Sequence, residues 1–129
     1  MIPEPAARCD RLYVYGTLRR GFVLHDYLAR LGAKFLTNAR VAAELIDQGR
    51  YPGPRPSVRK GHWVRGELFR LRQPARALTV LDKVKGFIPG APKRSLFVRA
   101  ATEVLLNNGS RVLAWIYWRG VRVRGGSHG

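Results

Sequence analysis

The segment Arg111–Trp118 constrains the fold more than any other, because every residue after its arginine is aliphatic or aromatic. Side chains of a strand alternate between its two faces, so both faces of this strand must be buried. The preceding segment Leu96–Leu106 also has the composition of a strand. Between the two lies the Asn108-Gly109 step, which is typical of tight hairpins. The C-terminal part of the chain therefore predicts a β-hairpin enclosed by the remaining elements.

Three further strands are predicted upstream from runs of β-branched, aromatic and aliphatic residues, at Arg11–Tyr15, Lys34–Asp47 and Trp63–Leu71. Between the last two, the proline-rich segment Gln48–Pro56 is predicted to be a loop. The reason is that proline cannot donate a hydrogen bond to a strand ladder.

Two short helices are predicted between these strands. Apolar residues recur at helical spacing from Leu24 to Leu31, and a glycine follows where helices commonly end. The second helix, Ala75–Lys85, has Pro74 at its start and Gly86 directly after its end, both favoured positions for these residue types.

Six or so strands with only two short helices predict an α+β fold, a small mixed and mostly antiparallel β-barrel covered by the helices. With 129 residues, the chain is expected to form a single domain over residues 1–119. A flexible, basic, glycine-rich tail is expected at 120–129. We expect a monomer or a small homo-oligomer.

Cys9 is the one cysteine of the chain, so an internal disulfide is impossible and no metal site is indicated. No apolar run approaches the roughly 20 residues of a membrane span. Residues 1–10 lack the apolar core of a signal peptide. These features predict a cytoplasmic protein without a membrane or metal partner.

The chain is strongly basic, with 24 Lys and Arg against 8 Asp and Glu. Such a balance favours binding to phosphates and raises nucleic acid as a possible partner. The basic residues are spread evenly, however, with 11 in residues 1–60 and 13 in 61–129, and none form a continuous run longer than a pair. A solvated surface is the favoured interpretation, and a nucleic-acid role is kept as an alternative.

The first strand ends in a turn, Tyr15-Gly16-Thr17-Leu18, that is suited to holding a small polar group. Gly16 allows the backbone to approach a ligand closely or to adopt a positive φ. Backbone amides could then bind that ligand. Thr17 either contacts the ligand or bonds the turn backbone.

Six segments resemble, in their order and spacing, the signature of the γ-glutamylcyclotransferase-like (AIG2-like) family. They are Tyr15–Leu18, Gly49–Gly53, Val64–Phe69, Leu81–Asp82 before Gly86, Phe97–Arg99 and Ala114–Tyr117. The resemblance covers about residues 11–118 and implies a compact mixed barrel with one cavity. It implies no cofactor.

Active members of that family cyclise a γ-glutamyl group: its α-amine attacks its own γ-carbonyl, giving 5-oxoproline and a free amine. The resemblance implies that the amides of Tyr15–Leu18 bind the glutamyl group. Tyr51 and Phe97 are further candidate contacts for the ligand. The family's proton-transferring glutamate falls at Lys85, and a family tyrosine falls at Phe97. A lysine ammonium cannot accept a proton. Whether this chain converts a γ-glutamyl substrate is therefore an open question.

Periodicity places Lys85 on the apolar stripe of its helix, at i+7 from Leu78 and i+4 from Leu81. It should point inward or extend from the edge of the core. Three roles remain open: a helix-terminal cation with its stem over apolar surface, a cation for an anionic ligand, or a base with a lowered pKa.

Other polar candidates have more ordinary interpretations. Asp82 is expected to cap its helix or pair locally, and Glu67 to form a semi-buried ion pair with an arginine. Tyr51 either lines the cavity or attaches its loop to the barrel. His25 and His62 lack partners at ligand spacing and are expected at the surface or the core edge.

Trp115 and Trp118 are expected to pack in the core.

Three functions remain open for this chain. They are a γ-glutamylcyclotransferase-type enzyme with an altered base, a catalytically inactive protein that binds a γ-glutamyl compound or another small carboxylate, and a basic nucleic-acid-associated protein. The retained turn favours the first, Lys85 and Phe97 favour the second, and net charge alone favours the third.

Overall fold

The computed structural model describes residues 9–15, 25–46, 53–57 and 59–120. Its elements are, in chain order, β1 (Arg11–Val14), α2 (His25–Arg30), β2 (Lys34–Ile46), β3 (Gly53–Pro56), β4 (Trp63–Arg70), α3 (Pro74–Val84), the 3-10 turn η2 (Pro92–Arg94), β5 (Phe97–Leu106) and β6 (Arg111–Arg119).

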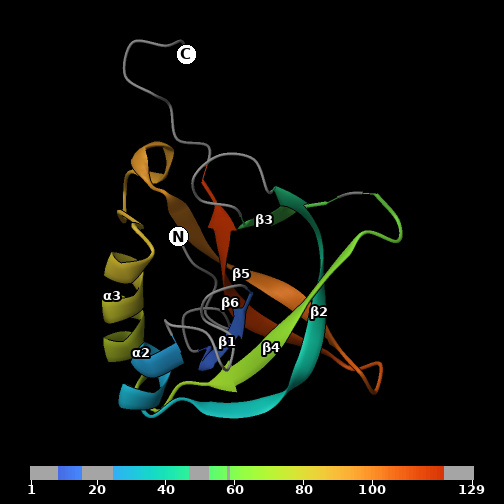
Figure 1. Ribbon diagram of the computed structural model, residues 1–129, viewed down its shortest axis with the longest axis horizontal. Helices are drawn as coiled ribbons and strands as arrows, with labels where there is room; N and C mark the ends of the chain where they lie inside the picture. Colours follow the sequence, from blue (N-terminus) through green and yellow to red (C-terminus); the bar gives the residue numbers. More distant parts are fainter. Residues whose placement is uncertain (1–8, 16–24, 47–52, 58, 121–129) are drawn as a thin grey trace.

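Five strands close into a barrel in the order β2-β4-β1-β6-β5, with β5 pairing back onto β2. The contact between β1 and β6 is parallel, and the other pairings are antiparallel. Helices α2 and α3 lie together on one side of the barrel (Figure 1). The predicted mixed, mostly antiparallel barrel with two helices is confirmed.

The expected loop at Gln48–Pro56 is wrong in part, because Gly53–Pro56 forms the sixth strand, β3, beside β2. The N–H of Ser57 donates to the carbonyl of Ala42 at 3.4 Å. In a strand, the N–H groups of alternate residues point to the same side. Because the N–H of Ser57 points to β2, the backbone nitrogens of the prolines at 54 and 56 face away from β2, and no hydrogen bond to β2 is lost there. An edge strand tolerates proline in that arrangement.

Two apolar clusters stabilise the fold, one on each face of the central strands. Tyr13, Val41, Leu68, Val104 and Ile116 belong to the cluster inside the barrel. The other lies between the barrel and the helices and includes Leu12, Leu28, Phe69, Leu78, Leu81 and Trp115. Burying each such side chain contributes about 1.5–3 kcal/mol. Strand β6 contributes to both clusters, as its uninterrupted apolar sequence predicts.

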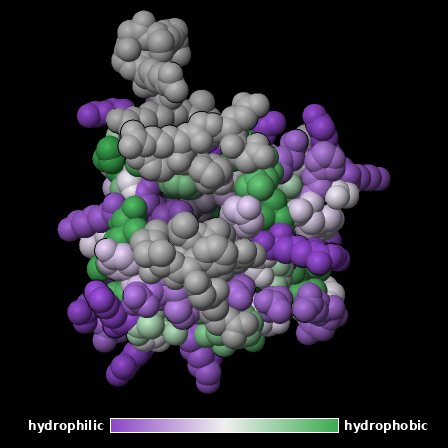
Figure 2. All heavy atoms as spheres, viewed as in Figure 1, coloured by the Kyte–Doolittle hydropathy of each residue, from purple (hydrophilic) through white to green (hydrophobic). Residues whose placement is uncertain are grey.

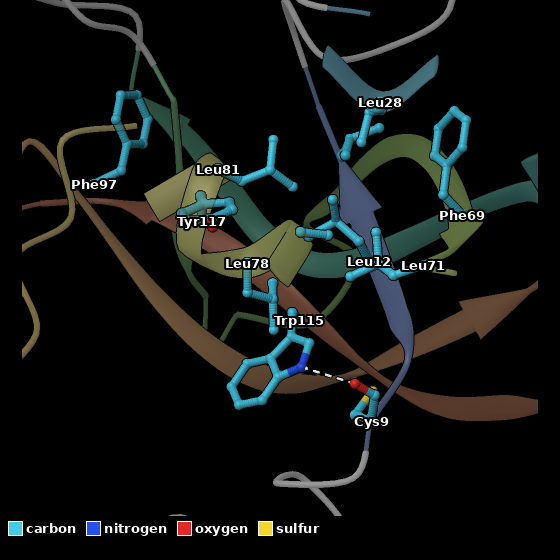
Figure 3. Close-up of a cluster of buried hydrophobic side chains, with 12 residues drawn as sticks. Cys9, Leu12, Leu28, Phe69, Leu71, Leu78, Leu81, Phe97, Trp115 and Tyr117 are labelled. Carbon is cyan, nitrogen blue, oxygen red and sulfur yellow. Dashed lines mark hydrogen bonds between the residues drawn. The ribbon is translucent and has the colours of Figure 1, made fainter. Parts of the chain in front are cut away.

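Trp115 is a core residue, as expected, and is 3% exposed. Its indole N–H donates to the carbonyl of Cys9 at 3.1 Å, which satisfies its polar atom within the cluster (Figure 3). The Cys9 thiol in turn donates to the carbonyl of Leu113 at 3.2 Å. These bonds attach the segment before β1 to β6.

Gly66 is required where β4 passes Tyr13 of β1. A β-carbon at this position would overlap the carbonyl oxygen of Val14 and lie 2.7 Å from the Tyr13 hydroxyl, which itself donates to the carbonyl of Val64 at 2.6 Å. Gly66→Ala is therefore expected to lower the free energy of unfolding by about 1–3 kcal/mol, measured by urea denaturation. An unchanged midpoint would contradict this close approach.

Hydrophilic side chains project from much of the viewed surface, with apolar ones between them (Figure 2). Among the described residues, no helix has both the length and the apolar character needed to cross a bilayer. The tail at 121–129 lies outside the described residues.

Candidate functional site

Lys85 ends helix α3 and directs its side chain onto Phe97 at the start of β5. Its backbone N–H donates to the carbonyl of Leu81 at 2.9 Å, and the chain then turns at Gly86, whose φ is 65°. The ammonium nitrogen lies 4.0 Å from the centroid of the Phe97 ring. This position agrees with the apolar stripe predicted from the sequence.

Burial lowers the pKa of Lys85 to about 8 from its ordinary value of 10.5. No carboxylate of the described residues lies within ion-pair distance of its ammonium. The aromatic ring is its main electrostatic partner, a contact of about 0.5–2 kcal/mol. Lys85 is thus a partly desolvated cation with a readily removable proton.

Phe97 also contacts β3. A β-carbon on Gly53 would lie 2.7 Å from the Phe97 ring, so only a glycine allows β3 to approach this closely. Phe97 is 8% exposed and stands at one end of the cluster beneath the helices, apart from Phe69 (Figure 3). The structure therefore brings together Lys85, Phe97 and Gly53, which come from three of the six motif segments.

Of the other predicted ligand contacts, Tyr15 is half-buried and packs against the cluster inside the barrel. The remaining four, Gly16, Thr17, Leu18 and Tyr51, lie outside the described residues. Their roles stay predictions.

A buried polar network lies one helical turn before Lys85. Asp82, 7% exposed, accepts two hydrogen bonds from the Arg99 guanidinium, at 2.8 and 3.1 Å, and one from the Tyr117 hydroxyl at 2.6 Å. The expectation that Asp82 caps or pairs locally is wrong. Its partners lie on β5 and β6, because helix α3 lies against those strands.

The network is enclosed by aromatic rings. The Arg99 guanidinium carbon lies 4.4 Å from the Trp115 ring centroid and 5.7 Å from that of Phe87. Burial, with the hydrogen bond to Asp82, raises the pKa of Tyr117 well above its usual range. Tyr117 therefore stays protonated and donates to Asp82. The alternating pattern of β6 identified Tyr117 as buried, but nothing local in the sequence indicated its partner.

The remaining polar candidates have the burial expected of them, and the ion pair between Glu67 and an arginine stays a prediction. Glu67 is half-buried. His25 lies at the core edge with its ring 6.1 Å from Phe69, and His62 lies 3.9 Å from Glu44. No cluster of three metal-ligating side chains occurs in the part of the chain that the structure describes.

Trp118 packs against the cluster inside the barrel, in agreement with the core expectation. It is half-buried and lines an open cleft of about 260 Å³ whose other walls include residues of β2, β4 and β5.

The sequence matches the model of one protein family over residues 12–128, and that family is described as gamma-glutamyl cyclotransferase, AIG2-like. The γ-L-glutamyl-butirosin B γ-glutamyl cyclotransferase of Niallia circulans is 32% identical over 108 residues, which make up 82% of this chain and 64% of that protein. The chain thus spans less than two thirds of this relative's length.

Two solved structures share the fold. An AIG2-like protein from Mus musculus superimposes with a TM-score of 0.63 at 22% identity, over 88% of this chain and 79% of that one. YkqA from Bacillus subtilis gives a TM-score of 0.64 at 23% identity, over 85% of this chain and 35% of that one. The match over residues 12–128 establishes that the chain belongs to the gamma-glutamyl cyclotransferase, AIG2-like family.

Proposed function

We propose that this protein binds a γ-glutamyl amine and converts it to 5-oxoproline and the free amine, with Lys85 as the proton acceptor. The glutamyl group would be held by the backbone amides of Tyr15–Leu18. The observation that carries this proposal is the placement of Lys85 at the position of the family's glutamate, with its ammonium 4.0 Å from the Phe97 ring centroid, where burial lowers its pKa to about 8.

The reaction requires a base because the attacking α-amine is protonated in solution. The free amine of Lys85 takes one proton from this ammonium, and the α-nitrogen then forms a bond to the γ-carbonyl carbon. Lys85 then gives its proton to the leaving nitrogen as the bond from the carbon to that nitrogen breaks. The α-nitrogen, now in the ring, loses its second proton to the regenerated free amine of Lys85, which passes it to the departing amine. Amide donors at the turn would stabilise the charge that develops on the carbonyl oxygen.

The pKa of Lys85 sets the pH dependence. A group with a pKa of about 8 is in its free-amine form in roughly a tenth of molecules at pH 7 and about half at pH 8. We therefore expect the rate of 5-oxoproline release at saturating substrate to rise through pH 8 and to level off near pH 9. The measurement uses a panel of γ-glutamyl amines and dipeptides. A rate that is constant from pH 7 to pH 9 would contradict the role of Lys85 as base.

A second candidate function is the binding of a γ-glutamyl compound or another small carboxylate without turnover. It is favoured by the same residue, since Lys85 is mostly cationic at neutral pH and its ammonium faces the Phe97 ring with no carboxylate beside it among the described residues. The pH dependence is then opposite: binding weakens above pH 8 as the cation is lost. Calorimetric titration with a non-cyclising γ-glutamyl analogue, together with the product assay, distinguishes the two.

A further inference from the structure

An unusual row of arginines crosses the outer face of the barrel. In the strand register, Arg65 of β4 lies directly opposite Arg40 of β2, Arg40 lies opposite Leu105 of β5, and Leu105 lies opposite Arg111 of β6. Directly opposed residues point to the same face of a sheet. Three of the four side chains in this row are therefore exposed cations on the outside of the barrel.

The fold does not neutralise this row. Arg65 forms no ion pair with any described residue, and the contact found for Arg40 is with an aromatic ring. Arg111 pairs with Glu103 at 3.1 Å, but the two side chains are 61% and 64% exposed, so the pair contributes little and can exchange. Like charges directly opposite each other on a sheet are destabilising. The stability of the fold therefore does not account for this row of arginines.

An exposed tryptophan stands beside the row on the same face. Trp63 is 40% exposed and lies opposite Ala42, the next outward residue along β2 from Arg40. The Arg40 guanidinium carbon is 5.0 Å from the Trp63 ring centroid. Trp63, Arg111 and Trp118 line the same open cleft of about 260 Å³. An exposed aromatic ring, a cleft and the arginine row thus occur together, with Glu103, the partner of Arg111, also lining the cleft.

Of the acidic residues near this face, Glu103 pairs with Arg111 and two others lie away from the row. Glu67 lies two residues from Arg65 along β4, and Glu44 lies four residues from Arg40 along β2, where Arg55 approaches it at 3.8 Å. The overall charge of +16 adds a long-range attraction for any polyanion.

We propose that this face, formed by Arg40, Arg65, Arg111 and Trp63, binds single-stranded nucleic acid. The arginines contact successive phosphates, and one base stacks on Trp63 at the mouth of the cleft. Proteins that bind single strands without sequence preference combine a basic surface with exposed aromatic rings in this manner. In a duplex the bases are stacked inside the helix, so no base has a free face on which Trp63 could stack.

The test uses the full chain and a fluorescein-labelled oligothymidylate of about 12 nucleotides, within the range that one such surface covers. Fluorescence anisotropy is recorded at several salt concentrations. The double variant Arg40→Gln/Arg65→Gln is expected to reduce the slope of log affinity against log salt by about 1.4, since each phosphate contact on a single strand contributes about 0.7. Trp63→Ala is expected to weaken binding about tenfold or more.

The matched control is Arg30→Gln/Arg76→Gln, which removes the same charge from exposed positions on α2 and α3. It should change the slope much less. Thermal unfolding followed by circular dichroism checks that all variants remain folded. Absence of binding by the unmodified protein, equal losses in the two double variants, or an unchanged affinity in a folded Trp63→Ala variant would overturn the proposal.

Discussion

Replacing Lys85 by methionine is expected to lower the rate of 5-oxoproline release by about 100- to 10,000-fold, the usual contribution of a positioned general base. Methionine keeps an unbranched apolar stem near Phe97 but has no amine. The rate is measured with the best substrate of the γ-glutamyl panel at pH 8. Because only the reacting group is lost, the protein should remain folded.

Lys83→Met is the matched control, since Lys83 lies on the same helix with an exposed side chain. It should leave the rate unchanged. Lys85→Glu restores the residue type of the family and is expected to retain turnover while losing the rise in rate through pH 8. If the unmodified protein gives no product and Lys85→Glu does, the enzymatic proposal is wrong and binding without turnover is supported.

Asp82→Ala is expected to lower the free energy of unfolding by about 3–5 kcal/mol, because it leaves the Arg99 guanidinium buried without its carboxylate. The same change removes the acceptor of the Tyr117 hydroxyl. Urea denaturation with linear extrapolation measures the loss. The helix that carries Lys85 is attached to β5 and β6 through this network, so activity should fall as well.

Glu103→Ala provides the comparison, because it removes one partner of the exposed ion pair with Arg111. Its expected cost is below about 1 kcal/mol. The double variant Asp82→Leu/Arg99→Met should recover much of the stability lost in Asp82→Ala, since the unpaired charge is removed with its partner. Equal costs for Asp82→Ala and Glu103→Ala would show that the buried network contributes no more than a surface pair.

Local signals in the sequence determined most of the elements. The Asn108-Gly109 step joined β5 to β6, and Pro74 and Gly86 bounded α3, because turn and cap preferences act over a few residues. The apolar stripe of α3 indicated that Lys85 turns toward the core. The number of strands and helices predicted the barrel, and the ordered motifs predicted the family.

Only the tertiary structure decided what depends on neighbours distant in the chain. Strand β3 was missed because prolines are excluded from a central strand but accepted at an edge, and edge position is a property of the sheet. The hydrogen-bond partners of Asp82 lie 17 and 35 residues away in the sequence. The lowered pKa of Lys85 comes from burial against the barrel, and the arginine row exists because strand register aligns residues from three strands. The sequence by itself determined the elements and the family, whereas the charge state of Lys85 and the outer basic face arise from how those elements pack.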